Sequence, residues 1–105
     1  MEPPISSKAA LLQALVAGPG FGLELITRVK DRTKGAVVLH QGSVYPALRA
    51  LEREGLLRSW EEPPPPQGGP PRRFYELTAE GRRAALRDQE IFAVFPLVPS
   101  LRGAS

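Results

Sequence analysis

The stretch that decides the fold is Gln41-Gly42-Ser43-Val44-Tyr45-Pro46-Ala47-Leu48-Arg49-Ala50-Leu51-Glu52-Arg53-Glu54-Gly55-Leu56-Leu57. Apolar residues at i, i+4 and i+7 form one stripe and predict a helix: Val44, Leu48 and Leu51. Ser43 is expected to cap this helix through its hydroxyl, with Pro46 in the first turn, where a missing N–H costs little. Gly55 stands where a left-handed residue ends a helix, and a strand is expected directly after it.

The opposite face of this helix carries Ser43, Tyr45, Arg49 and Arg53. Hydroxyls and arginines match the donors and acceptors that base pairs present in the major groove of DNA. Most amphipathic helices of this size, however, are core helices with a solvated outer face. The neighbouring segments must therefore decide between the two interpretations.

Two helices are expected before this stretch. The first runs from Ser6 or Ser7 to about Ala17 and has a strong apolar face made by Leu11, Leu12, Leu15 and Val16. Gly18-Pro19-Gly20 breaks it.

The second helix is expected from about Gly22 to Thr33, with Gly35 ending it. The residues expected to face inward are Leu23, Ile26 and Val29. The basic residues expected to face outward are Arg28, Lys30, Arg32 and Lys34. Val37-Val38-Leu39 is then a three-residue strand or an extended connector.

A β-hairpin and a last helix are expected after the opening stretch. Strands over 56–61 and 72–77 flank the loop Pro63 to Pro71, whose prolines hold the backbone extended and whose Gly68-Gly69 pair permits a reversal. The proline run also fits a ligand for an SH3-like groove, but the flanking strands favour a stiff wing. Thr78 is expected to cap a helix that ends before Pro96.

Together these elements predict a mainly α fold with a small β-hairpin, a winged helix-turn-helix with an added C-terminal helix. The 105 residues form one domain. We expect a winged-helix core over 6–77, a C-terminal dimerisation helix over 78–95 and a tail over 96–105.

Composition narrows the classes of function. Fourteen basic and 11 acidic residues give a net charge of +3, and 11 of the 14 basic residues are arginine, which suits bidentate contact with phosphate and guanine. The chain has no cysteine and one histidine, so thiolate and histidine-rich metal sites are excluded and no cofactor is expected. It shows no signal-peptide pattern, no membrane-spanning run and no catalytic constellation. A cytoplasmic protein that is not an enzyme is expected.

Three motifs resemble the PadR family of bacterial winged-helix transcriptional regulators. They are Gly42-Ser43-Val44-Tyr45-Pro46-Ala47-Leu48 with Leu51-Glu52 and Gly55-Leu56-Leu57, then Arg72-Arg73-Phe74-Tyr75-Glu76-Leu77-Thr78-Ala79-Glu80-Gly81-Arg82, and more weakly Gly18-Pro19 with Phe21-Gly22-Leu23-Glu24-Leu25-Ile26. The resemblance implies a homodimer that binds operator DNA, usually as a repressor, and whose dimer contact is supplied by the final helix. The chain departs from the family pattern there, because Pro96 and Pro99 cut the last helix short.

We therefore expect a repressor that binds palindromic double-stranded DNA as a homodimer; whether a small-molecule effector acts on it stays open. The residues expected to contact DNA are Gln41, Ser43, Tyr45, Arg49, Arg72, Arg73 and Lys34. Those expected at the dimer contact are Ile91, Phe92, Phe95 and Leu12.

Alternatives stay open for several of these residues. The Tyr45 ring can pack over the start of its helix, Ser43 can act as a cap alone, and Lys34 can be a solvated lysine. Arg72 and Arg73 alternate across a strand, so only one of them can face DNA on a regular strand. The alternative for the whole chain is a winged-helix protein-interaction module that does not bind DNA.

Overall fold

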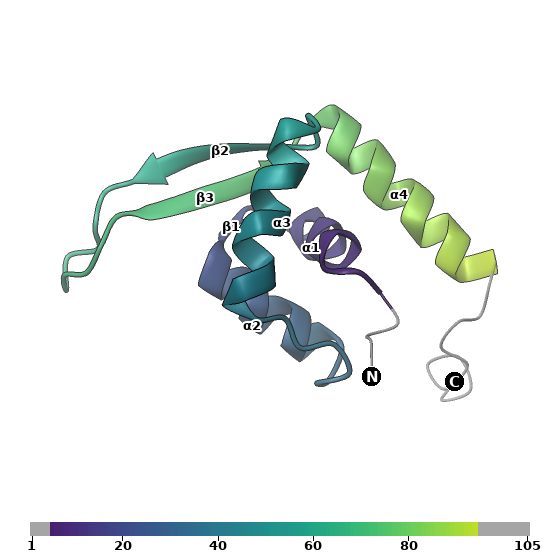
Figure 1. Cartoon of the computed structure of the whole chain (residues 1–105), viewed down its shortest axis with the longest axis horizontal. Coiled ribbons are helices and arrows are strands. Elements are labelled where there is room, and N and C mark those ends of the chain that lie inside the picture. Colours follow the sequence, from purple (N-terminus) through teal and green to yellow (C-terminus); the bar gives the residue numbers. More distant parts are fainter. Residues whose placement is uncertain (1–4, 95–105) are drawn as a thin grey trace.

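The computed structural model describes residues 5–94, with side chains through residue 89. Its elements, in chain order, are α1 (Ser7–Val16), β1 (Gly20–Phe21), α2 (Gly22–Arg32), α3 (Gln41–Arg53), β2 (Leu57–Glu62), β3 (Arg72–Leu77) and α4 (Ala79–Val94). Figure 1 shows α1, α2 and α3 gathered in the middle, with the β2–β3 hairpin projecting to one side and α4 to the other. This arrangement confirms the winged helix-turn-helix with an added C-terminal helix.

The sheet has three antiparallel strands in the order β1-β3-β2. The hairpin register pairs Leu57 with Leu77 at the base and Glu62 with Arg72 toward the loop. Strand β1, which no sequence pattern predicted, pairs Gly20 with Tyr75 and Phe21 with Phe74. Two residues are too few for an alternation of polar and apolar side chains to be visible in a sequence.

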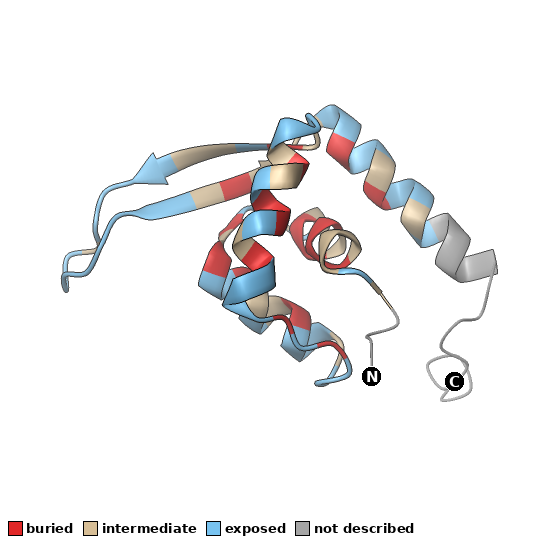
Figure 2. Cartoon of the chain, viewed as in Figure 1, coloured by how far each residue is buried: buried red, intermediate tan, exposed pale blue. Residues whose placement is uncertain are grey.

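The core lies where α1, α2, α3 and the base of the hairpin meet, as the buried residues in Figure 2 show. Its largest fully buried side chains are Leu11, Leu15, Leu25, Leu48, Leu51 and Val44. The stripe predicted on α3 is therefore confirmed. The connector between α2 and α3 forms no strand, yet it contributes the buried side chains of Val37 and Leu39 to the same core.

Helix α3 begins two residues earlier than the predicted cap. His40 is the N-cap, and its carbonyl accepts the backbone N–H groups of both Ser43 and Val44 at 2.9 Å. The Ser43 hydroxyl donates to that same carbonyl at 3.1 Å, so the prediction that Ser43 caps the helix is wrong. Pro46 consequently lies in the second turn, on the exposed face of the helix. At the other end Gly55 has a φ of 80°, as expected for a left-handed residue after a helix.

Two predictions for α2 are also wrong. Leu23 is 49% exposed, and Leu25 is the leucine of this helix that is fully buried. Arg28 does not point outward: its guanidinium donates to the carbonyls of Ala14, Gly18 and Pro19 at 2.8 to 3.0 Å. The end of a helix leaves carbonyls without intrahelical partners, and Arg28 satisfies those that follow α1.

The remaining caps hold as predicted. The Ser6 hydroxyl accepts the N–H of Ala9 at 3.1 Å, and the Thr78 hydroxyl accepts the N–H of Gly81 at 3.0 Å. Thr78 also donates its hydroxyl to the carbonyl of Gly55. The start of α4 is thereby tied to the turn that ends α3, next to the hairpin.

Candidate nucleic-acid interface

The outer face of α3 is polar along its length. Val44, Ala47, Leu48 and Leu51 are buried, while the exposed residues of the helix are Gln41, Gly42, Ser43, Pro46, Arg49 and Arg53. Of the residues predicted to contact DNA, Gln41, Ser43 and Arg49 therefore lie exposed on this one helix. The helix offers arginine, amide and hydroxyl groups to a ligand, which are the groups that base edges and phosphates accept.

The Tyr45 ring lies over the start of α2. A Cβ built on Gly22 would lie 2.5 Å from Tyr45 Cε1 and 2.7 Å from the hydroxyl oxygen, so the ring occupies the space that a side chain at position 22 would need. Tyr45 is half-buried as a result. Tyr45 therefore packs against the start of α2 rather than over the start of its own helix, and this packing holds the hydroxyl at the junction of α2 and α3.

The two wing arginines lie on opposite faces of the hairpin, as the strand alternation predicts. Arg73 shares its face with Tyr75 and Leu57, which are buried toward the helices. Arg72 lies on the other face, with its guanidinium 4.6 Å from the centre of the Phe21 ring. Arg73 is therefore the wing arginine on the same side as α3.

A short hydrogen-bonded chain connects Arg73 to α3. Arg73 Nη1 donates to Ser59 Oγ at 2.9 Å, and Ser59 Oγ donates to Glu52 Oε2 at 2.7 Å. These three residues come from β3, β2 and α3. Glu52 and Ser59 were not among the predicted site residues, because their contact depends on how the hairpin packs against the helix.

Charged groups from α3 and the wing converge around Tyr75. Burial raises the pKa of the Tyr75 hydroxyl above its ordinary value of 10.0, and the Glu52 carboxylate raises that pKa further. The positive charges of Arg73 and Arg49 act in the opposite direction. The buried Tyr75 hydroxyl thus responds to charges on both α3 and the wing.

Aromatic rings cover the outer face of the wing. Trp60 stacks on Phe74 with ring centres 6.0 Å apart, Phe21 meets Phe74 edge-on at 5.3 Å, and Arg58 lies 5.6 Å from the Trp60 ring. Stacked aromatic pairs across neighbouring strands stabilise a hairpin. Trp60 is therefore a packing residue of this cluster.

Lys34 lies in the turn after α2. It is exposed and has a φ of 54°, a left-handed conformation that an ordinary side chain seldom adopts. Gly35 follows with a φ of 82°, and the Gly35 N–H donates to the Lys30 carbonyl at 2.8 Å. The ammonium group is on the surface, and its contact with DNA remains a prediction.

Of the four residues predicted at the dimer contact, the structure describes the side chain of Leu12 alone. Leu12 is 5% exposed and packs in the core of its own chain, so its side chain is not available to a partner. Ile91 and Phe92 lie within α4, but their side chains fall outside the described residues, as does all of Phe95.

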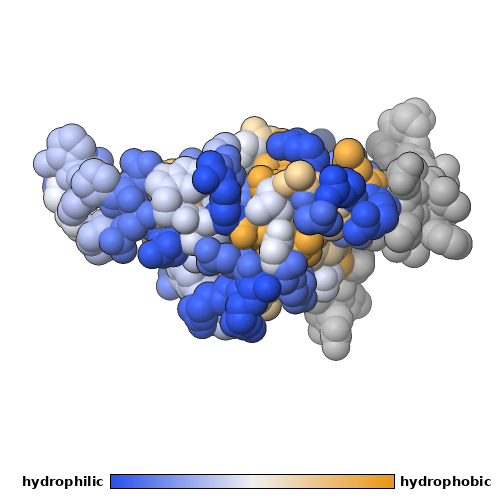
Figure 3. Space-filling view, turned by 90° about the horizontal axis from the view of Figure 1, so that it is seen from above, coloured by the Kyte–Doolittle hydropathy of each residue, from blue (hydrophilic) through white to orange (hydrophobic). Residues whose placement is uncertain are grey.

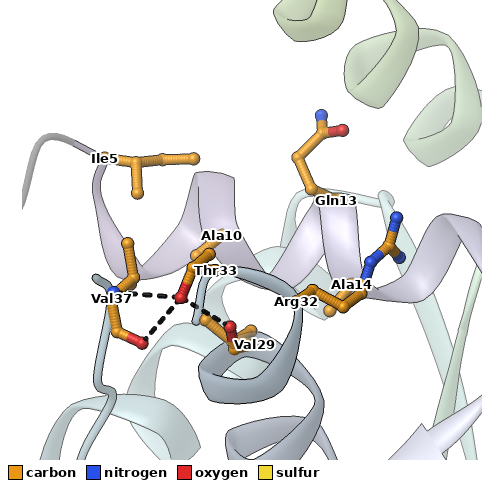
Figure 4. A pocket seen from close by; sticks show the side chains of 8 residues that line it. All are labelled: Ile5, Ala10, Gln13, Ala14, Val29, Arg32, Thr33 and Val37. Carbon is orange, nitrogen blue, oxygen red and sulfur yellow. Dashed lines mark hydrogen bonds between the residues drawn. The ribbon is translucent and has the colours of Figure 1, made fainter. Parts of the chain in front are cut away.

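An apolar cavity of about 250 Å³ lies between α1, the end of α2 and the connector that follows α2 (Figure 4). It is lined by Ile5, Ala10, Gln13, Ala14, Val29, Arg32, Thr33 and Val37. The Thr33 hydroxyl is already engaged, because it donates to the Val29 carbonyl at 2.8 Å and accepts the Val37 N–H at 3.0 Å.

The surface divides along the long axis of the molecule. Figure 3 shows the wing as mostly hydrophilic, whereas hydrophobic residues gather over the middle. Among the side chains that the structure describes, through residue 89, no three metal-binding groups come together, and none of the described helices has the length and apolar character to cross a bilayer.

The sequence of this chain matches a known protein family. The family model described as the transcriptional regulator PadR-like family matches residues 11–87. No curated protein sequence matches the chain.

Solved structures share the fold. A PadR family transcription regulator from Clostridium difficile is similar with a TM-score of 0.73 and 22% identity, covering 90% of this chain and 95% of that chain. A transcriptional regulator from Clostridium thermocellum gives a TM-score of 0.70 and 22% identity, covering 89% of this chain and 88% of that chain. Bacillus subtilis PadR in complex with operator DNA gives 0.67 and 21% identity, covering 76% of this chain and 44% of that chain.

Proposed function

Because the chain belongs to the PadR-like family of transcriptional regulators, we propose that it binds specific DNA sequences through α3 and the wing. The observation that carries this proposal is the exposed Arg49 on the outer face of α3, together with Arg73 on the hairpin face that is hydrogen-bonded to α3 through Ser59 and Glu52. A winged helix-turn-helix inserts its recognition helix into the major groove and contacts the DNA backbone with neighbouring elements. Arg49 would then read a base edge or phosphate, and Arg73 would neutralise a phosphate.

The operator complex of Bacillus subtilis PadR supports the same use of the fold in this chain. On this reading, Gln41 and Ser43 in the first turn of α3 lie near the DNA, and Tyr45 offers its hydroxyl beside them. Lys34 would add a phosphate contact from the turn after α2. Arg72, on the far face of the wing, would contribute mainly by holding Phe21.

We further propose that the chain represses transcription in the cytoplasm as a homodimer on a palindromic operator. Helix α4 runs to Val94, and Ala85 on its inner face is fully buried against the domain. In the sequence, Phe92 follows Ala85 by seven residues, a spacing typical of one helix face, and Ile91 and Phe95 are the apolar residues nearest to it that we assign to the same contact. Pairing of these apolar residues between two copies would set two recognition helices about 34 Å apart.

The competing function is a winged-helix module that binds proteins and not DNA. Such a module would need exposed apolar side chains on α3. Among the described residues, the large hydrophobic side chains that are exposed are Leu23, Val38 and Leu86, none of which belongs to α3. This distribution favours DNA as the partner of α3.

Selection of bound sites from random DNA, followed by binding assays with Arg49→Ala, tests the proposed function. If Arg49 reads a guanine edge, the variant should lose about 1–3 kcal/mol of binding free energy at one operator position. Arg87→Ala is the matched control, because Arg87 is an exposed arginine on α4 rather than on α3. Failure to enrich any DNA sequence, or equal losses of binding free energy in Arg49→Ala and Arg87→Ala, would contradict the proposal.

The dimer is tested by sedimentation of the wild type beside an Ile91→Asp, Phe92→Asp double variant. We expect the wild type to sediment as a dimer and the double variant as a folded monomer. A wild type that stays monomeric at high micromolar concentration yet binds a palindrome tightly would show that the dimer contact lies elsewhere.

A further inference from the structure

We propose that Ser59 is a positioning residue for DNA binding, which holds the Arg73 guanidinium against the recognition helix before DNA arrives. This inference rests on the proposed function, because it concerns how the wing arginine is presented to a phosphate. Ser59 itself is not required to touch DNA. It acts through Arg73 and through the Glu52 carboxylate.

The hydroxyl of Ser59 acts both as a hydrogen-bond acceptor and as a hydrogen-bond donor. It accepts from Arg73 Nη1 at 2.9 Å and donates to Glu52 Oε2 at 2.7 Å. A serine hydroxyl has one donor hydrogen and two acceptor lone pairs, so it can join a cation to an anion in this way. Hydrogen bonds to charged groups are stronger than those between neutral groups. One small side chain thus joins β3, β2 and α3.

The position of Ser59 in the sheet fixes which arginine it can hold. Ser59 is paired with Tyr75 in the hairpin register, and Arg73 is two residues from Tyr75 on the same face. Arg72 lies on the other face, over the Phe21 ring. Ser59 therefore acts on Arg73 and not on Arg72, which makes Arg72 a control on the same strand.

The hydrogen bonds that join Arg73 to Glu52 through Ser59, called here the Ser59 bridge, leave Arg73 able to bind a phosphate. Within the described part of the chain, its one side-chain hydrogen bond is through Nη1 to Ser59, and no ion pair joins it directly to Glu52. A guanidinium has five N–H donors, so the others remain available for phosphate oxygens. Arg73 is exposed, in keeping with this role.

Holding Arg73 in place matters because an ordered arginine costs conformational entropy. A free arginine side chain loses much rotamer freedom when DNA orders it, and that loss weakens binding. If Ser59 orders the side chain in the free protein, part of that cost no longer falls on the binding step. The same bridge fixes the base of the wing against α3, so the spacing between Arg49 and Arg73 is set before contact.

The test is a double-mutant cycle on the DNA site selected for the wild type. Ser59→Ala, Arg73→Ala and the double variant are compared by titration of labelled DNA at several salt concentrations. We expect Ser59→Ala to weaken binding about 3- to 10-fold, on the scale expected for losing the preorganisation of one side chain. In the Arg73→Ala background the same substitution should have almost no further effect.

Salt dependence and two more substitutions separate positioning from general stability. Arg73→Ala should reduce the log–log salt slope by about 0.9, the value for one lost phosphate contact. Ser59→Thr keeps the hydroxyl and should bind within about twofold of the wild type. Ser59→Cys keeps the side-chain size but supplies only a weak donor and acceptor, and it should behave like Ser59→Ala. Thermal unfolding of each variant confirms that it is folded.

The outcomes distinguish this inference from the function on which it rests. A wild type that binds no DNA overturns both. A wild type that binds DNA, with Ser59→Ala and Ser59→Cys equal to it, overturns the positioning role alone. Additive losses from Ser59→Ala and Arg73→Ala would also overturn it, because they would mean that Ser59 does not act through Arg73. Arg72→Ala should show no coupling to Ser59→Ala.

Discussion

The packing of α4 against the hairpin makes a sharp prediction for Gly81. This residue is buried in the first turn of α4, and a Cβ built on it would lie 1.9 Å from the carbonyl oxygen of Leu56. Ordinary contacts of a Cβ begin at 3.4 Å, so Gly81→Ala requires a separation of about 1.5 Å between α4 and the Leu56 backbone. The obstacle is a backbone carbonyl, which cannot rotate away as a side chain can.

The expected magnitude follows from two opposing effects. Overpacking of this kind costs typically about 1–3 kcal/mol, and a backbone obstacle places Gly81→Ala at the upper end. The Leu56 carbonyl also accepts the Thr78 N–H at 3.0 Å, and separation would stretch that bond. Replacing glycine by alanine within a helix returns about 1 kcal/mol or less. We expect a net loss of about 2 kcal/mol in the free energy of unfolding.

Urea denaturation followed by circular dichroism and by Trp60 fluorescence measures this loss. Gly42→Ala is the matched control, because Gly42 is also helical and nothing lies within 4 Å of a Cβ built there. That control should be unchanged or more stable by up to about 1 kcal/mol. A Gly81→Ala variant as stable as Gly42→Ala would refute the close approach of α4 to Leu56.

Three further predictions concern single side chains. Arg28→Met should lower the free energy of unfolding by about 2–3 kcal/mol, because it leaves three carbonyl groups without their donor. The control Lys30→Met, on the same helix, should change it little, and equal melting temperatures of the two variants would contradict this prediction. Gly22→Ala should displace the Tyr45 ring and weaken DNA binding, yet destabilise less than Gly81→Ala, because a side chain can move; unaltered DNA affinity would count against a role for Tyr45. The raised pKa of Tyr75 means that the folded state holds the phenolic proton more tightly than the unfolded state does. This group's contribution to stability is therefore complete below pH 10.0 and is lost as the pH rises through the folded pKa. Above pH 10.0 the urea midpoint should fall less steeply with pH for Tyr75→Phe than for the wild type, and parallel declines would contradict the shift.

The sequence predicted the parts of the fold whose patterns are periodic. The α3 stripe of Val44, Leu48 and Leu51 and the alternation of the hairpin strands could be read directly, because burial on one face imposes a fixed spacing. Strand β1 could not, since its two residues join the sheet only through pairing with Phe74 and Tyr75.

Several errors concern polar groups, whose hydrogen-bond partners cannot be predicted from sequence spacing. Arg28 was expected outward as a charged residue, but carbonyls after α1 draw its guanidinium inward. Ser43 fits the sequence rule for a cap, yet the helix begins earlier, at Gln41, with His40 as its N-cap. Ser59 and Glu52 carried no signal at all, because their contact depends on the angle between α3 and the wing.

The most direct test of DNA recognition by α3 and the wing is the salt dependence of binding to the selected DNA site. The proposed interface predicts that the logarithm of affinity falls linearly with the logarithm of salt concentration, with a slope of about −0.9 for each neutralised phosphate. Scrambled DNA should bind more weakly at every salt concentration. An affinity for the selected site that does not change with salt, or no binding to DNA at any salt, would contradict the account.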